Sequence, residues 1–354
     1  MSNELTRREF VGQSLAVVGA LELGGTLTTI ALGQTRQAAI SVSLASVTFT
    51  GLWYPGRALT VEEVIDHAKQ YGYDGVELNG KRPHCYPLEM TNNRCQDIRK
   101  YAADKGVKIF ALAGNNDFSS PIPEHRESQV IALREVMRVA SNMGAKVIRV
   151  FLASPGVTQS LEQGGGSYEF AKKVWDFEHQ GYSKEQIWDW CRKGMMESTR
   201  YAREFGVTMA LVNHPPVIKD YHDVLRMVNE VDSPNLMASL EPPMMLEEQK
   251  NEPEVRKAVF AVGQFLKMSR FSGDFNRGPD GKVTGATVPI YPYFVRALLD
   301  LGYQGHISYE LCSPIPEAKG TQALQEVERT ARMAAEFMRT TIKEAEQVPR
   351  QAHA

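Results

Sequence analysis

The chain has 354 residues, with 40 Lys and Arg against 42 Asp and Glu, so its formal net charge is −2. This length fits about two average domains or a single α/β barrel. A hydrophobic content of 43% and a charged content of 23% are ordinary for a globular protein and exclude a disordered chain or a coiled coil. The near-zero charge also argues against nucleic acid as a partner, because proteins that follow a phosphate backbone concentrate Lys and Arg.

Residues 1–33 have the pattern of an export signal. Arg7 and Arg8 precede an apolar, small-residue stretch over 11–32. A basic start followed by such a stretch is typical of a secretory signal, and the paired arginines favour the twin-arginine route. The alternatives are an ordinary secretory signal or a membrane anchor, although Glu22 disfavours an anchor because a charge at mid-bilayer is costly. We therefore predict a periplasmic or exported protein with no stable membrane insertion after signal removal.

In the mature chain, residues 34–354, one unit recurs: a helical pattern that ends in Gly and leads into a short apolar run. Gly closes a helix because it adopts the left-handed conformation without strain. The predicted strands cover about residues 39–46, 74–78, 107–112, 146–151, 207–211, 236–240, 264–270 and 307–310, and a final helix covers 321–346. Buried strands that alternate with helices predict a parallel sheet. Eight units of this kind, with no GxGxxG motif after a strand, predict a single-domain (β/α)8 TIM barrel.

One interruption of this pattern, residues 152–187, is unusually long. It contains Gly164, Gly165 and Gly166 together with several aromatic residues. Long loops after barrel strands are often functional, so this segment is either a lid over the barrel mouth or a structural excursion.

The four cysteines are too few and too scattered for a disulfide framework or a CxxC metal site. Cys85 and Cys95 would meet an oxidising compartment after export, and the sequence leaves open whether they pair.

Polar residues follow several predicted strands, at the end of the barrel where active sites form. Glu241 and Glu310 directly follow apolar strand runs. Buried carboxylates must be paired, protonated or bound to metal, so we predict that both belong to a functional site. His214 is either a site residue or a histidine bonded to a neighbouring loop.

Glu77 follows the same logic at the end of another predicted strand. It is either part of the site or a carboxylate paired with Lys81 or Arg82.

Three segments, 72–78, 210–215 and 302–311, resemble the xylose isomerase-like TIM-barrel superfamily of sugar isomerases and epimerases. The resemblance covers nearly the whole mature chain and implies a sugar or sugar-derived small molecule as the ligand. Segments 81–84 and 269–275 resemble exported or sugar-catabolic members, some of which act on oxidised glycosides. The predicted substrate-binding residues are Arg82, His84, Glu77 and Arg270, with Lys81 as a further candidate.

The resemblance also implies one divalent metal ion, held by a Glu, an Asp, a His and a Glu on four consecutive strand ends. Here Glu310 matches the last Glu and Glu241 replaces the Asp, whereas Val212 and Arg270 stand at the other two positions. Valine cannot ligate a metal, and arginine carries a fixed positive charge and no acceptor. The predicted metal ligands are therefore Glu241, Glu310 and His214. Carboxylates with one imidazole suit Mn²⁺ best, with Mg²⁺ or Zn²⁺ as alternatives.

Two functions remain open at this point. The first is a sugar isomerase, epimerase or related lyase, in which a metal polarises the substrate and Glu241 and Glu310 move a proton through an enediolate. The second is a metal-free carbohydrate-binding protein or a non-catalytic partner subunit, which Val212 and Arg270 favour. Arg270 would then pair with Glu241 or Glu310. A variant keeps catalysis without metal, with one of these carboxylates as base and Arg270 facing a developing enolate.

An endonuclease for damaged DNA is disfavoured, because such sites need many histidine ligands at the barrel mouth. Of the eight histidines here only His84 and His214 lie near predicted strand ends, and the net charge is negative. The sequence leaves open whether the protein is a homo-oligomer.

Overall fold

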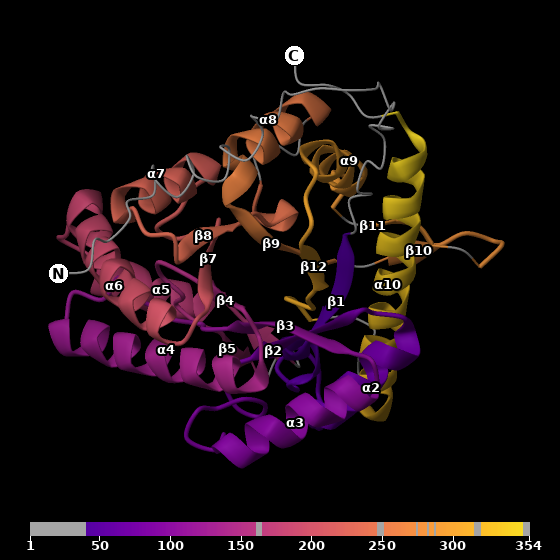
Figure 1. Ribbon diagram of the computed structural model, residues 1–354, viewed down its shortest axis with the longest axis horizontal. Helices are drawn as coiled ribbons and strands as arrows, with labels where there is room; N and C mark the ends of the chain where they lie inside the picture. Colours follow the sequence, from indigo (N-terminus) through magenta and orange to yellow (C-terminus); the bar gives the residue numbers. More distant parts are fainter. Residues whose placement is uncertain are drawn as a thin grey trace, which may run out of the picture.

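The protein is a closed barrel of eight parallel strands in the order β1-β12-β9-β8-β7-β4-β3-β2. The computed structural model describes residues 40–160, 165–245, 251–273, 275–281, 283–286, 288–314 and 320–349. In Figure 1 the helices surround these strands, which confirms the predicted single-domain (β/α)8 barrel. The predicted export signal, residues 1–33, lies outside the described residues.

Each predicted strand corresponds to a barrel strand, with bounds that differ by a few residues. The barrel strands are β1 (Ser41–Ala45), β2 (Gly75–Asn79), β3 (Lys108–Ala113), β4 (Val147–Val150), β7 (Thr208–Val212), β8 (Leu236–Ser239), β9 (Leu266–Phe271) and β12 (His306–Tyr309). β9 starts later than predicted because Gly263–Phe265 forms a 3-10 turn.

The helices begin and end where local chemistry places them. They are α2 (Val61–Tyr71), α3 (Asn92–Asp104), α4 (Pro123–Met143), α5 (Glu169–Glu178), α6 (Lys184–Glu204), α7 (Tyr221–Val231), α8 (Glu252–Val262), α9 (Tyr291–Leu301) and α10 (Ala323–Gln347). Thr60 and Glu63 form a reciprocal capping box at the start of α2, and Gly72 ends it with a φ of 81°. The predicted final helix is α10.

The strands divide their side chains between two environments, because successive residues point to opposite faces. Outward side chains pack against the helices and form the main hydrophobic core. Inside the barrel, Ala111, Ala210 and Met268 form a second, small apolar cluster. Above that cluster the inward positions become polar, which prepares the site at the carboxyl ends of the strands.

The segment 152–187 is structured over its described residues, 152–160 and 165–187. It contains a hairpin of β5 (Thr158–Ser160) and β6 (Gly165–Ser167), then α5 and the start of α6. A Cβ atom added at Gly166 would lie 2.8 Å from Cζ3 of Trp53, so the hairpin packs directly on that ring. A role for this segment as a lid stays a prediction. A second hairpin, β10 (Phe275–Arg277) with β11 (Val283–Ala286), extends outward past α10 in Figure 1.

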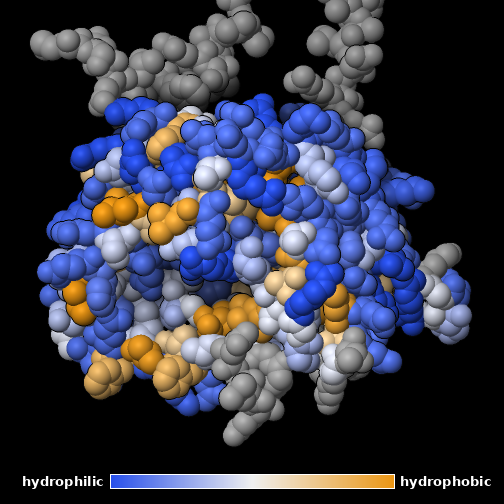
Figure 2. All heavy atoms as spheres, turned by 90° about the horizontal axis from the view of Figure 1, so that it is seen from below, coloured by the Kyte–Doolittle hydropathy of each residue, from blue (hydrophilic) through white to orange (hydrophobic). Residues whose placement is uncertain are grey.

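All four cysteines are free thiols, and Cys85 and Cys95 are both buried without a disulfide between them. Within the described ranges, no helix combines the length and apolar character needed to cross a membrane. Figure 2 shows one face of the molecule, where hydrophilic side chains predominate and hydrophobic ones form separate patches around a central hollow.

Candidate functional site

A cavity of about 600 Å³ lies at the carboxyl ends of the barrel strands. Its floor is formed by residues that leave the strands on the inward side: Arg149 from β4, Glu241 after β8, Arg270 from β9 and Glu310 after β12. Strand alternation places all of these on the same inner face, above the small apolar cluster. The predicted site carboxylates Glu241 and Glu310 therefore do meet in one cavity.

The first charged group on the floor is an ion pair between Arg149 and Glu241. Nε of Arg149 donates to Oε1 of Glu241 at 2.5 Å, and Nη2 donates to Oε2 at 2.7 Å. The two side chains are 3% and 6% exposed. Asn213 fixes the main chain of Glu241, because the Glu241 amide donates to Oδ1 of Asn213 at 2.8 Å. Both carboxylate oxygens of Glu241 are therefore occupied.

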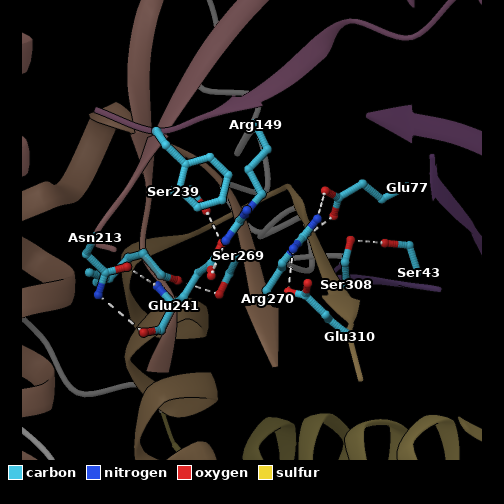
Figure 3. Close-up of polar contacts among 12 residues, drawn as sticks. Ser43, Glu77, Arg149, Asn213, Ser239, Glu241, Ser269, Arg270, Ser308 and Glu310 are labelled. Carbon is cyan, nitrogen blue, oxygen red and sulfur yellow. Dashed lines mark hydrogen bonds and ion pairs between the residues drawn. The ribbon is translucent and has the colours of Figure 1, made fainter. Parts of the chain in front are cut away.

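The second group is a three-residue network centred on Arg270. Nε of Arg270 donates to Oε2 of Glu77 at 3.0 Å, and Nη2 donates to Oε1 of the same carboxylate. Nη1 donates to Oε2 of Glu310. Figure 3 shows Arg270 between the two carboxylates, with Arg149 and Glu241 beside this network.

The electrostatics of this network keep Glu77 and Arg270 charged. Burial alone would raise the pKa of Glu77, but the charge and hydrogen bonds of Arg270 outweigh it and hold that pKa below its ordinary value. Burial would lower the pKa of Arg270, yet the charges of Glu310 and Glu77 keep it well above its ordinary value. Three carboxylates thus face two guanidinium groups, and one of the three, Glu77, is completely buried and is not among the described residues that line the cavity.

The predicted metal ligands, Glu241, Glu310 and His214, do not form a ligand set. No group of three His, Cys, Asp or Glu side chains in the described part of the chain is placed to hold a metal ion. Nδ1–H of His214 donates to the Pro215 carbonyl at 2.6 Å, and its ring meets the edge of Phe151. Burial and the charge of Arg149 lower the pKa of His214.

The chemistry of the donors explains this correction. Glu241 is held by Arg149 and Glu310 is bonded to Arg270, and a guanidinium group has no acceptor atom and repels a divalent cation. Val212, on the inward face with Ala210, adds no ligand. The residues present therefore do not fit the divalent metal that the resemblance implied.

Of the two alternatives for Glu77, the structure shows the paired carboxylate, but its partner is Arg270 inside the barrel and not Lys81 or Arg82. Glu77, also predicted as a substrate contact, is not among the described residues that line the cavity. Lys81 and Arg82 instead line the cavity beyond the end of β2. The guanidinium of Arg82 donates to Glu89 at 2.6 Å and lies 4.0 Å above the ring of Tyr86.

His84, predicted as a substrate contact, is not among the described residues that line the cavity. It is 4% exposed, and its Nε2–H donates to the Leu59 carbonyl at 3.0 Å. Burial lowers the pKa of His84 to about 4. The histidine therefore supports the β2–α3 loop from behind the cavity wall.

Sequence reasoning missed Arg149 and two aromatic residues of the cavity wall, Trp53 and Phe151, whereas Tyr168 lies in the long segment whose aromatic residues it had noted. Arg149 stands inside the apolar strand run 146–151, and a charge in a buried strand was the signal that could have placed it in the barrel interior. Trp53, Phe151 and Tyr168 line the cavity, and the Trp53 and Tyr168 ring centroids are 5.3 Å apart. These three aromatic residues come from separate loops, so no local pattern groups them.

Comparison with known proteins agrees with this architecture. Residues 65–341 match the protein family described as xylose isomerase-like TIM barrel. A relative, fructoselysine 3-epimerase of Escherichia coli O157:H7, is 22% identical over 292 residues, which cover 79% of this chain and 96% of that protein.

Solved structures of sugar epimerases share the fold. D-psicose 3-epimerase with D-tagatose from Clostridium cellulolyticum H10 superposes with a TM-score of 0.62 at 16% identity, covering 86% of this chain and 99% of that one. The apo form of 3-keto-D-glucoside 4-epimerase from E. coli gives a TM-score of 0.61 at 16% identity, covering 85% and 100%. At these identities the likeness establishes the barrel and its strand order.

Proposed function

Because the chain belongs to the xylose isomerase-like TIM barrel family, we propose that it binds a sugar or sugar-derived compound in the barrel mouth without a divalent metal ion. One observation carries the proposal: Arg270 stands at a position where the family resemblance implies a metal-binding His, and it is bonded to both Glu77 and Glu310. The guanidinium supplies the positive charge of the site.

The walls of the cavity support a sugar as the ligand. Trp53, Phe151 and Tyr168 offer apolar ring faces, on which the C–H faces of a sugar ring can pack. The floor supplies hydrogen-bonding groups from Arg149, Arg270 and the carboxylates, which suit hydroxyl groups. A mainly apolar cavity with a few placed polar groups is typical of a small-molecule site.

A second candidate is metal-free proton transfer, and the geometry of Glu310 favours it. Only Oε2 of Glu310 is bonded to Arg270, and its side chain is 17% exposed, whereas the side chain of Glu77 is completely buried. Oε1 of Glu310 makes no hydrogen bond to another described residue, so it is available to accept a proton from a carbon next to a carbonyl group. Arg270 uses three of its five N–H groups on carboxylates and keeps two for a developing enolate oxygen.

Calorimetry of the folded protein with D-fructose, D-tagatose and D-psicose tests the binding proposal. We expect the same affinity with EDTA and with added Mn²⁺, since the bound sugar contacts only side chains. Affinity that appears only with Mn²⁺ and vanishes with EDTA would overturn the proposal.

A designed variant sharpens this test. Arg270→His with Glu77→Gln removes the cation without leaving Glu77 buried and unpaired. We expect this variant to bind Mn²⁺ more tightly than the unaltered protein does, and Glu77→Gln alone serves as its matched control.

Proton transfer has a separate readout. Incubation with the same ketoses in D₂O, followed by NMR, reports deuterium at the carbon beside the carbonyl. We expect incorporation by the unaltered protein and a loss of at least tenfold in Glu310→Gln. Absence of deuterium alongside measurable sugar binding would refute the second candidate and leave the first in place.

We also propose that the protein is exported by the twin-arginine route. The sequence over 1–33 supports this, with Arg7 and Arg8 ahead of the apolar stretch. A reporter that is active only after twin-arginine export, fused behind residues 1–33, tests the proposal. Replacing both arginines by lysine is expected to abolish the signal, and an unchanged signal would refute the route.

A further inference from the structure

Among the described residues that line the cavity, the lysines and arginines are paired with carboxylates with one exception, and we propose that this exception, Lys81, binds an anionic group on the ligand. The ligand class is then an anionic sugar, such as a sugar acid or a sugar phosphate. The inference rests on the proposed sugar-binding function and specifies its substrate class.

Four of the cations that line the cavity already have carboxylate partners. On the floor, Arg149 pairs with Glu241 and Arg270 with Glu77 and Glu310. On the walls, Arg82 pairs with Glu89 and Lys172 with Asp176. An ion pair of this kind satisfies the cation and leaves little of its charge for a ligand.

Lys81 differs from all four. Its ammonium group makes no hydrogen bond or ion pair with another described residue, although the side chain lines the cavity. Asp117 is the acidic group that acts on it, but both Asp117 oxygens are taken by Ser119 and Ser154. The side chain is open to water in the cavity, yet surrounding protein lowers the pKa of Lys81. A cation that loses part of its hydration without gaining a partner is a favourable site for an anion.

The residues beside Lys81 extend the same donor surface. Asn79, the last residue of β2, is 7% exposed and lines the cavity. Its Oδ1 accepts from Nδ2 of Asn115 at 2.6 Å, which leaves the Asn79 amide NH₂ group without a hydrogen bond to another described residue. Asn115 has a φ of 49°, a left-handed conformation that is uncommon outside glycine and occurs most often for Asn and Asp. Asn79 and Lys81 thus both contribute donor groups to the lining of the cavity.

The floor explains why the anion belongs on this wall. On the floor both guanidinium groups are already bonded to carboxylates, Arg149 to Glu241 and Arg270 to Glu77 and Glu310, so neither is an unpaired cation for the charged end of a ligand. An anionic sugar therefore binds with its charged end at Lys81 and Asn79 and its hydroxyl groups toward the floor. This orientation separates the charged end of the ligand from Glu310.

Calorimetry with matched sugar pairs tests the inference on the folded protein. The probes are D-glucuronate and D-glucose 6-phosphate against D-glucose, and D-galacturonate against D-galactose. We expect at least one anionic probe to bind about tenfold more tightly than its neutral partner, as one charge-assisted hydrogen bond provides. The preference is expected to weaken as ionic strength rises. The relative affinities of the uronate and the phosphate identify which anionic group the site prefers.

Two variants assign the preference to its residue. Lys81→Met is expected to abolish the preference while neutral sugars still bind. Lys172→Met, which removes a cavity cation that is already paired, is expected to retain it, and circular dichroism checks that both variants are folded.

The outcomes separate the two proposals. Equal affinity for charged and neutral probes, or a preference that survives Lys81→Met, overturns this inference and leaves sugar binding intact. Absence of binding by every probe here and by the neutral ketoses overturns the proposed function itself.

Discussion

Two buried arginines inside the barrel differ in the number of carboxylates with which they form ion pairs. Arg149 is joined to one carboxylate, Glu241, in a two-bonded pair that occupies both oxygens. Arg270 is joined to two carboxylates, Glu77 from β2 and Glu310 after β12. We call the first pair the closed pair, because Arg149 bonds both carboxylate oxygens of Glu241. In the second, Oε1 of Glu310 makes no hydrogen bond to another described residue.

This difference identifies the carboxylate on which the proposed proton transfer depends. A buried carboxylate with both oxygens bonded to arginine is a weak acceptor for a ligand proton, because its negative charge is already stabilised. These contacts support a structural role for Glu241 and Glu77, and they are the reason that the proposed proton acceptor is Glu310. Four changes test this contrast.

Replacing Arg270 by Met has the largest expected effect. It leaves both Glu77 and Glu310 without a cation, and removal of one partner from a buried ion pair costs about 3–5 kcal/mol. We expect a loss at or above the upper end of that range in the free energy of unfolding, measured by urea denaturation. The double variant Arg270→Met with Glu77→Gln is the control and is expected to recover part of the loss. A change below about 1 kcal/mol, the range of exposed pairs, would contradict the network.

Replacing Arg149 by Met is expected to cost less. Only Glu241 loses its partner, so we expect the free energy of unfolding to fall by about 3 kcal/mol, the lower end of the range for a broken buried ion pair. The same denaturation measurement, run beside Arg270→Met, gives the order of the two effects. If Arg149→Met proves the more damaging change, the closed pair and not the three-residue network is the main electrostatic support of the floor.

The pH dependence of stability distinguishes the contribution of the buried histidines from that of the ion pairs. Burial lowers the pKa values of His84 and His306 to about 4 from an ordinary 6.5, so below pH 6.5 the unfolded chain binds protons that the folded protein does not. The contribution of these two histidines to the free energy of unfolding is complete above pH 6.5 and declines as the pH falls toward 4. At pH 5 the expected loss is about 2 kcal/mol per histidine, from about 1.4 kcal/mol per pH unit.

Glu77 affects the free energy of unfolding at a lower pH than the histidines do. Its pKa is held below the ordinary 4.5, so its contribution is present above 4.5 and is lost as pH falls further through its folded value. Urea denaturation at pH 7, 5 and 4 checks both ranges, with His306→Gln as the comparison. If the loss between pH 6.5 and 5 is the same in His306→Gln as in the unaltered protein, that histidine is not its source.

Replacing Glu310 by Gln has the smallest expected effect on stability. The amide oxygen still accepts from Arg270, and the group is the least buried of the three, so the change in unfolding free energy stays within about 1 kcal/mol. Glu241→Gln is the matched change in the closed pair, and we expect it to destabilise the protein more. Equal losses in the two variants would show that the two carboxylates share one environment.

Individual residues show which contacts of the site could be predicted from the sequence. The ion pair between Arg270 and Glu310 was one of two predicted pairings and is confirmed. The alternative partner, Glu241, is instead held by Arg149 from β4, a residue that sequence reasoning left in a strand without a role. His84 was predicted at the substrate because of its neighbours in the sequence, yet its side chain turns behind the wall.

The sequence by itself determined the barrel, because glycine-closed helices and apolar strand runs are local patterns that each segment carries alone. It also placed acidic and basic residues at strand ends, since strand alternation fixes which side chains face inward. Only the tertiary structure decided which charges pair. Glu77 and Arg270 are 193 positions apart, and Arg149 and Glu241 are 92 apart. Their contacts exist because closing the barrel brings distant strand ends within a few ångströms of one another. At that distance the Coulomb attraction between buried charges determines which residues pair, and no local sequence pattern predicts it.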